Sequence, residues 1–141
     1  MIINCPFCSI DEDKTRIIEE KERIVVILSS PSLMPGHILV IPKRHIEKIS
    51  ELNPDERADL FDTAIEYHKK IIERFSKGCD MRQHYRPFLA QSDVKVDHVH
   101  IHLLPRENED ELYQKSMQFE RDMWQRPDEI ELQKFVELFG K

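Results

Sequence analysis

Within the segment 97–106, residues 98–103 alternate strictly between polar and apolar, which is the pattern of a β-strand with one buried face. Successive side chains of a strand point to opposite faces, so the polar residues share one face and the apolar residues share the other. We therefore predict a strand that is buried on one side and presents three imidazoles to a common ligand on the other. The alternating residues are His98, Val99, His100, Ile101, His102 and Leu103.

Further strands are predicted where short apolar runs lie between turn-forming residues. The run at 24–28 is β-branched and almost wholly apolar, so we expect a central strand that is covered on both faces. Pro42 is expected to end the strand that begins at His37, and Pro105 to end the histidine strand. The predicted ranges are 16–20, 23–28, 37–41 and 81–88, with loops at 29–36 and 90–93.

The segment 53–78 has the clearest helical pattern. Asn53 suits the N-cap, Pro54 suits the first helical position, and Glu56 completes a capping-box spacing. Gly78 is expected to end the helix. The apolar residues form a stripe that we expect to pack against the apolar face of the histidine strand, with His68 as a hydrogen-bonded structural residue. The stripe comprises Phe61, Ala64, Ile65, His68, Ile71, Ile72 and Phe75.

Beyond residue 106 the composition becomes acidic and helical. The segment 109–124 looks helical without a clean apolar stripe, whereas the segment 128–139 has one. We interpret the chain as a single domain, 1–141, with a core at 1–106 and a helical C-terminal extension at 107–141.

The length, composition and net charge of the chain restrict the class of protein. A chain of 141 residues with 40% hydrophobic and 34% charged content is typical of one soluble globular domain. A net charge of −6 argues against a protein that mainly grips a nucleic-acid backbone. We find neither a leader-like segment before Cys5 nor an apolar run of membrane-spanning length, and the three cysteines fit a reducing compartment. These features predict a cytoplasmic protein that binds neither membranes nor nucleic acids.

Cys5 and Cys8 form a lone Cys-x-x-Cys motif, which occurs in redox sites, in zinc sites and in metal-free turns. A thioredoxin-like site needs a following helix, but the segment 9–14 is polar and loop-like. Two thiolates supply half of a tetrahedral zinc site, so two further ligands would have to come from elsewhere in the chain.

The histidine segment resembles the His-x-His-x-His signature of the histidine triad family of nucleotide hydrolases and transferases. The likeness continues through 104–106 and includes the Pro-Gly-His sequence at 35–37, so it covers roughly residues 5 to 106. The segments 83–88 and 110–113 resemble the bacterial diadenosine-tetraphosphate-hydrolase-like branch. The resemblance implies an α+β fold, with an antiparallel sheet of about five strands, one long helix and the helical extension, and it implies a homodimer.

The resemblance also implies a role for each histidine. His100 would attack the α-phosphorus of a nucleotide and form a nucleotidyl-histidine intermediate, while His102 would donate to the phosphate or bridging oxygens. His98 would either orient His100 or bind zinc, and His37 would lie near the leaving phosphate and help to protonate the leaving group. A P-loop mechanism is excluded, since the chain has only three glycines and no glycine-rich loop.

Zinc-bearing relatives in this family suggest where the missing metal ligands lie. They place a histidine just after the second core strand and also use the first histidine of the triad. The resemblance therefore implies a structural zinc held by Cys5, Cys8, His45 and His98.

The sequence departs from the family pattern at two places. Many members carry Gly-Gln before the first triad histidine to hold the phosphate, where this chain has Asp93 and Val94. Gln91 and Ser92 are the candidates to serve instead through a shifted turn. Many members carry Asn or Asp on the ribose hydroxyls, where this chain has Ser29.

We expect hydrolysis of a dinucleoside polyphosphate or a related nucleotidyl conjugate. Two alternatives remain open at this point: a nucleotidyl transferase or phosphorylase, and a nucleotide- or zinc-binding module without turnover. For the enzyme we expect a bell-shaped pH profile, with an acidic limb close to neutrality if the histidines keep their usual pKa near 6.5.

Overall fold

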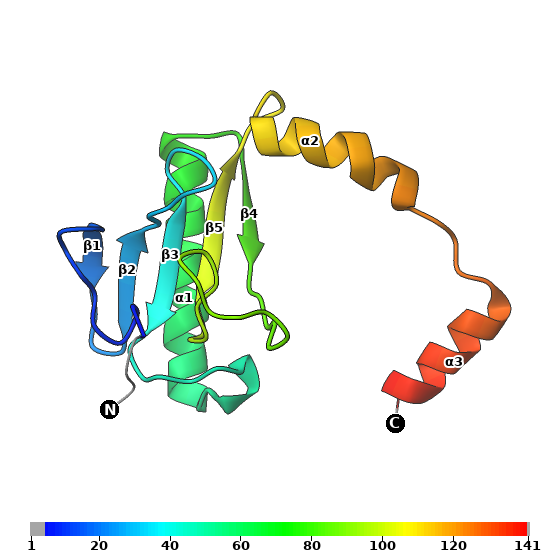
Figure 1. Cartoon of the computed structure of the whole chain (residues 1–141), viewed down its shortest axis with the longest axis horizontal. Helices are drawn as coiled ribbons and strands as arrows, with labels where there is room; N and C mark the ends of the chain where they lie inside the picture. The colour runs from blue at the N-terminus through cyan, green and yellow to red at the C-terminus, as the bar shows by residue number, and fades with distance from the viewer. Residues whose placement is uncertain (1–4, 141) are drawn as a thin grey trace. The chain divides into compact units, whose positions relative to one another are not determined.

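The computed structural model describes residues 5–140, and its strands form one five-stranded antiparallel sheet in the order β1-β2-β3-β5-β4 (Figure 1). This confirms the predicted α+β architecture. The segment 97–106, which carries the three histidines and is called the triad segment below, enters β5 at Ile101, and β5 lies between β3 and β4. The strands are β1 (Ile17–Glu20), β2 (Ile24–Leu28), β3 (Ile38–Pro42), β4 (Gly78–Arg82) and β5 (Ile101–Arg106).

Helix α1 (Pro54–Arg74) begins as predicted, after a short 3-10 helix at Ile49–Glu51. The Glu56 amide donates to the Asn53 side chain at 2.9 Å, and the Asn53 amide donates back to the Glu56 carboxylate at 3.0 Å. The predicted end at Gly78 is wrong. The chain must leave the helix earlier because Gly78 already pairs with Arg106 as the first residue of β4.

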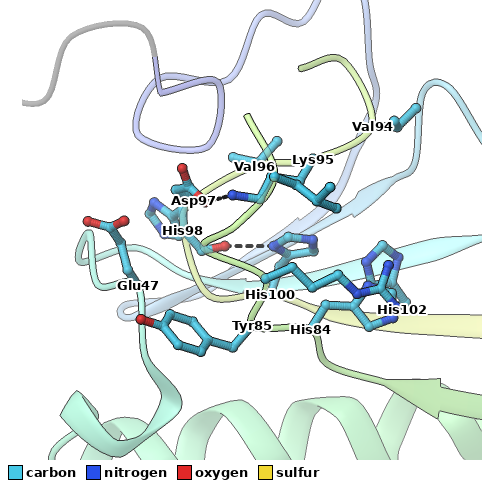
Figure 2. A pocket seen from close by; sticks show the side chains of 12 residues that line it. Glu47, His84, Tyr85, Val94, Lys95, Val96, Asp97, His98, His100 and His102 are labelled. Atoms are coloured by element: carbon cyan, nitrogen blue, oxygen red, sulfur yellow. Dashed lines mark hydrogen bonds and ion pairs between the residues drawn. The ribbon is translucent and has the colours of Figure 1, made fainter. Parts of the chain in front are cut away.

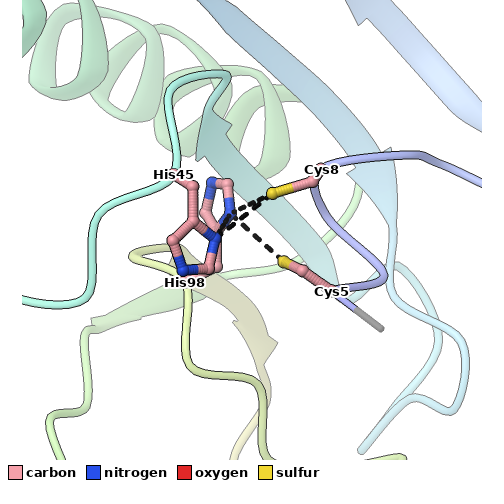
Figure 3. A group of neighbouring side chains, drawn as sticks. All are labelled: Cys5, Cys8, His45 and His98. Atoms are coloured by element: carbon pink, nitrogen blue, oxygen red, sulfur yellow. Dashed lines mark hydrogen bonds between the residues drawn. The ribbon is translucent and has the colours of Figure 1, made fainter. Parts of the chain in front are cut away.

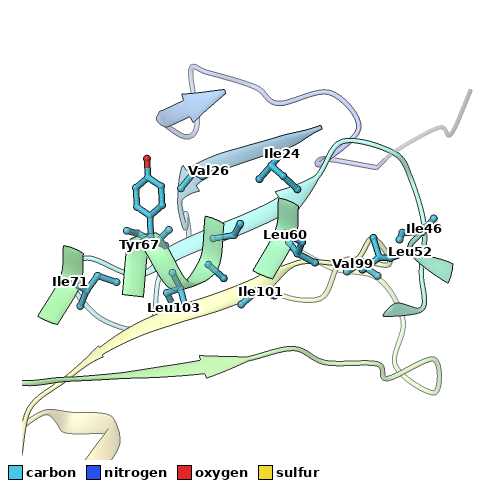
Figure 4. Packing of buried hydrophobic residues seen from close by; sticks show 13 residues of the cluster. Ile24, Val26, Ile46, Leu52, Leu60, Tyr67, Ile71, Val99, Ile101 and Leu103 are labelled. Carbon is cyan, nitrogen blue, oxygen red and sulfur yellow. The ribbon is translucent and has the colours of Figure 1, made fainter. Parts of the chain in front are cut away.

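Two apolar clusters hold the sheet, one on each face. The larger lies between α1 and the sheet, and it contains all three apolar residues of the alternating segment, as predicted (Figure 4). The smaller lies on the opposite face, where Phe7, Ile10 and Ile17 pack over β2 and β3. The larger cluster consists of Ile24, Val26, Ile38, Val40, Ile46, Leu52, Leu60, Ala64, Tyr67, Ile71, Val99, Ile101 and Leu103.

The apolar stripe predicted for α1 is in fact split between the core and the surface. Ala64 and Ile71 are buried together with Leu60 and Tyr67, which the predicted stripe left out. His68 has the structural role expected, since its Nε2 lies 3.1 Å from the Cys79 carbonyl oxygen. A broad helical stripe covers more than one face, and here part of it remains exposed: Phe61 (38%), Ile65 (59%), Ile72 (43%) and Phe75 (62%).

The strand predicted at 81–88 is wrong, because β4 covers Gly78–Arg82 and the chain then forms a loop. The ladder between β4 and β5 ends at the pair Arg82–His102, so the residues after Arg82 have no strand to pair with. Pro105 does not end β5. The ladder to β3 stops at Leu103, and a proline is tolerated where a strand has an unpaired side.

The chain divides after Glu107 into two compact units. The second contains α2 (Glu111–Glu120), a 3-10 helix at Arg121–Met123, and α3 (Glu129–Phe139), with Asp110 and Asp128 as N-caps. None of these helices buries a residue, so the apolar stripe predicted for 128–139 is exposed. Over residues 5–140, no helix has the length and apolar character needed to cross a membrane.

Candidate active site and metal cluster

His37 reaches the site through a turn that requires glycine. Gly36 has a φ of +80°, and a Cβ at this position would lie 2.9 Å from the Phe75 ring. The turn leads directly into β3, whose residue Leu39 pairs with His102. The two imidazoles meet there, with His37 Nε2 at 2.9 Å from His102 Nδ1.

The first two triad histidines precede the regular strand. The backbone amide of Val99 donates to the Ile46 carbonyl at 2.8 Å, so this part of the segment is held by the loop after β3. Val99, Ile101 and Leu103 nevertheless face the helix-side core, and the imidazoles are directed away from that core, as the alternation predicts.

The side chains of Cys5, Cys8, His45 and His98 converge on one point (Figure 3). Their ligand atoms all lie within 4.8 Å of one another. The Nδ1 atoms of the two histidines are 3.2 Å apart. Cys8 Sγ lies 3.2 Å from His45 Nδ1, and His98 Nδ1 lies 3.4 Å from Cys5 Sγ and 3.6 Å from Cys8 Sγ.

These separations fit a tetrahedral zinc ion. Zinc–nitrogen bonds of about 2.0 Å and zinc–sulfur bonds of about 2.3 Å at tetrahedral angles place two nitrogens about 3.3 Å apart, and a nitrogen and a sulfur about 3.5 Å apart. The other ring nitrogen of His98, Nε2, donates to the Pro42 carbonyl at 2.7 Å, which leaves the lone pair of Nδ1 directed into the cluster. The four residues can therefore bind a metal.

His98 orients His100 through its backbone rather than through its ring. His100 Nδ1 lies 2.6 Å from the His98 carbonyl oxygen, and a carbonyl can only accept, so Nδ1 carries the proton. The Nε2 atom of neutral His100 therefore has a free lone pair. The Phe7 ring packs edge-on against His100, with centroids 4.9 Å apart, and so links the N-terminal segment to this imidazole.

His102 has the opposite tautomer, which a chain of hydrogen bonds determines. The Leu33 amide donates to His37 Nδ1 at 3.1 Å, so His37 carries its proton on Nε2. That proton is donated to His102 Nδ1, which leaves the His102 proton on Nε2. His37 thus lies behind His102 and acts on the pocket through it.

Burial keeps these imidazoles neutral. It lowers the pKa of His37 to about 4 and that of His102 to about 3, with neighbouring histidines adding to both effects. Burial also lowers the pKa of His98 and of His100. These shifts argue against an acidic limb near neutrality for His37 or His102, because both remain unprotonated well below pH 6.5.

A pocket opens over His100 and His102 (Figure 2). Much of its wall comes from the loop between β4 and β5, where a strand at 81–88 and a loop at 90–93 are predicted from the sequence. His84 in this loop lies 5.1 Å from His102 between ring centroids. The lining residues are Glu47, His84, Tyr85, Arg86, Leu89, Val94, Lys95, Val96, Asp97, His98, His100 and His102.

The predicted substrate-binding residues lie outside this lining. Ser29 Oγ donates to the Pro31 carbonyl at 2.7 Å, beside the start of β3. Gln91 Oε1 accepts from the Asp97 amide at 3.0 Å, and Ser92 Oγ accepts from the Val94 amide at 3.3 Å, so both residues shape the loop. Their roles toward a substrate stay predictions.

Comparison with known proteins agrees with this geometry. The model of the HIT domain family matches residues 11–109. The chain is 34% identical over 101 residues to a protein from Arabidopsis thaliana named bifunctional bis(5'-adenosyl)-triphosphatase/adenylylsulfatase FHIT, a match that covers 68% of this chain and 55% of that protein. The chain thus spans about half the length of this relative.

Two solved structures extend the comparison. A HIT family protein from Bacillus subtilis has a TM-score of 0.71 and 26% identity, covering 96% of this chain and 94% of that one. A zinc-bound histidine triad family protein from Mycobacterium smegmatis has a TM-score of 0.64 and 25% identity, covering 84% and 91%. With the family match extending over most of its length, the chain belongs to the HIT domain family.

Proposed function

We propose that the protein is a hydrolase that cleaves a dinucleoside polyphosphate or a related nucleotidyl conjugate at the α-phosphorus. The observation that carries the proposal is the hydrogen bonding of two neighbouring histidines, which assigns them opposite tautomers. His100 offers a lone pair and His102 offers an N–H group, and both line the same pocket. A nucleophile and a donor side by side are what displacement at phosphorus requires.

In the first step, His100 Nε2 attacks the α-phosphorus and the bond from phosphorus to the bridging oxygen breaks. The ring becomes positively charged, and the His98 carbonyl stabilises that charge through the Nδ1 hydrogen bond. His102 Nε2–H donates a hydrogen bond to the departing oxygen. A polyphosphate leaves as an anion, so a neutral donor is sufficient.

In the second step, water attacks the phosphorus of the nucleotidyl-His100 intermediate. The phosphorus–nitrogen bond breaks and its electron pair returns to Nε2 of His100. The products are a nucleoside monophosphate and a proton released to solvent or product. His37 keeps His102 in the donor tautomer through both steps.

A product assay tests this function. The purified protein is incubated with dinucleoside polyphosphates and nucleoside phosphoramidates, with and without inorganic phosphate. Nucleoside monophosphate as the product supports hydrolysis, whereas phosphate-dependent nucleoside diphosphate identifies a phosphorylase. Tight nucleotide binding without any product would contradict the enzyme and support a binding module.

We also propose that Cys5, Cys8, His45 and His98 hold one structural zinc, which would tie the N-terminal segment to the triad segment. The tetrahedral spacing of the four ligand atoms supports this assignment. The similar protein from Mycobacterium smegmatis is described as zinc-bound, which supports the choice of metal. Metal analysis of the purified protein should find about one zinc per chain.

The homodimer is also a proposal. The exposed residues Phe61, Ile65, Ile72 and Phe75 form a second apolar stripe along α1, and an uncovered apolar stripe supports association with another copy. Sedimentation analysis tests this. We expect a dimer that the substitution Ile65→Lys converts to monomer, and a parent protein that is monomeric at micromolar concentration would contradict the proposal.

A further inference from the structure

A dinucleoside polyphosphate brings several negative charges into the pocket. His102 accepts a hydrogen bond at Nδ1 from His37 and is therefore a neutral donor at Nε2, while His100 must be neutral to attack, so the two imidazoles offer a hydrogen bond and a lone pair rather than positive charge. The described residues include no glycine-rich phosphate loop. The charge beyond the attacked phosphate must therefore be met by other groups on the pocket wall.

Two cations line the described part of the pocket, and both come from the loop between β4 and β5. The Lys95 side chain is only 14% exposed, and its ammonium group is paired with the Asp97 carboxylate (Figure 2). The Asp97 backbone amide is in turn held by Gln91. An ammonium group has three N–H donors, so the pair with Asp97 leaves donors available for phosphate oxygens.

Arg86 differs from Lys95 because its side chain is exposed and is not paired with a carboxylate in the described part of the chain. Across residues 5–140 its guanidinium makes no hydrogen bond or ion pair. Burial lowers the pKa of His84, and the nearby charge of Arg86 lowers it further. A planar guanidinium can bind phosphate oxygens with two parallel hydrogen bonds. Of the acidic residues on the same wall, Asp97 is paired with Lys95, and Glu47 lies toward the metal cluster, 4.0 Å from His45 Nε2.

We propose that Arg86 and Lys95 form a subsite for the phosphates beyond the one that His100 attacks. The subsite makes the enzyme selective for polyphosphate substrates over nucleotidyl conjugates that have an uncharged leaving group. The proposal rests on the proposed hydrolase function and deepens it by naming the substrate class. Lys95 acts as a hydrogen-bond donor held in place by Asp97, and Arg86 supplies an unpaired positive charge on a planar guanidinium that can bind two phosphate oxygens.

The test compares two substrates in four proteins: the parent, Arg86→Gln, Lys95→Gln, and the control Lys69→Gln. Lys69 is an exposed residue of α1 paired with Glu73, so its replacement removes the same charge away from the pocket. For diadenosine tetraphosphate, we expect kcat/KM to fall about tenfold or more in each pocket variant, mainly through KM. For adenosine phosphoramidate, whose leaving group is ammonia, we expect less than about a threefold change.

Two further measurements complete the test. Lys95→Arg should restore much of the tetraphosphate activity, because it restores the charge. Binding of inorganic tripolyphosphate, measured by calorimetry, should weaken at least about fivefold in both glutamine variants and not in Lys69→Gln. This binding assay does not depend on turnover.

The outcomes are separable. Equal losses on both substrates would overturn the subsite and assign the two residues to the attacked phosphate or to the fold, and no loss on either substrate would also overturn it. If the parent turns over neither substrate, the proposed hydrolase function fails, and tripolyphosphate binding then decides the subsite alone. Unchanged tripolyphosphate binding in both glutamine variants would overturn it.

Discussion

The two ends of the triad segment carry the same side chain in different surroundings. At the His98 end, the protein engages both ring nitrogens, one at the backbone of Pro42 and the other in the cysteine and histidine cluster. At the His102 end, His37 engages one nitrogen and the other is available to the pocket. The partner of the second ring nitrogen, rather than the residue type, therefore decides whether a histidine has a structural or a chemical role.

The largest effect should come from removing the histidine between the two ends. His100→Ala deletes the nucleophile but leaves the metal cluster and the His37–His102 pair in place. We expect turnover to fall by roughly a thousandfold or more, while folding and nucleotide affinity stay nearly unchanged. Steady-state rates, calorimetry and thermal melting measure the three quantities. In the parent, mass spectrometry of quenched reactions should find a nucleoside monophosphate bound to His100. Near-parental rates in the variant would contradict the assignment of His100 as the nucleophile.

The next effect should be on stability, at the His98 end. Cys8→Ser, or removal of the metal by a chelator, should lower the free energy of unfolding by several kcal/mol, because metal binding is coupled to folding. Turnover should also fall, since Phe7 would no longer be held against His100. The matched control is Cys79→Ser, which removes the third cysteine outside the cluster. If the purified protein contains no metal and its melting temperature does not change when zinc is added, the proposed zinc site is wrong.

A smaller effect on rate is expected at the His102 end. His102→Asn keeps a hydrogen-bond donor but loses the fixed Nε2–H geometry that His37 imposes. Turnover should fall by more than about tenfold with nucleotide affinity nearly kept, because the lost interaction forms mainly with the departing oxygen. The melting temperature should change little. A variant that loses affinity but turns over bound substrate at the parental rate would contradict the donor role.

The smallest effect concerns stability at acidic pH. His37 and His102 have folded pKa values of about 4 and about 3, against 6.5 for an unperturbed histidine. As pH falls below about 6.5, these two histidines become protonated in the unfolded chain but stay neutral in the folded chain. The free energy of unfolding therefore declines toward pH 4. Denaturant titrations across this window should give a shallower decline for His102→Asn than for the parent. Parallel curves would show that His102 does not titrate as its burial implies.

The sequence predicted most reliably those features that depend on residues close together in the chain. The alternation of histidines with Val99, Ile101 and Leu103 identified the buried face, because a strand has a period of two residues. The capping box at Asn53 identified the helix start for the same local reason. Both signals lie within a few residues of the structure that they specify.

The parts that could not be predicted depend on contacts distant in sequence. Arg86 and Lys95 lie in a loop without periodicity, whose position follows from where the β5 ladder ends at His102. The end of α1 follows from the pairing of Gly78 with Arg106. The orientation of His100 by a carbonyl was also hidden, since the identity of a side chain does not reveal what its backbone will contact.

That carbonyl has a consequence for mutational tolerance. Because every residue type carries a backbone carbonyl, substitution at position 98 can remove the imidazole without deleting the acceptor that orients His100. The imidazole of His98 is therefore not needed to orient His100, and it can serve as a metal ligand instead. Replacement of the His98 side chain should therefore act directly on the metal cluster while the acceptor for His100 Nδ1 stays in place.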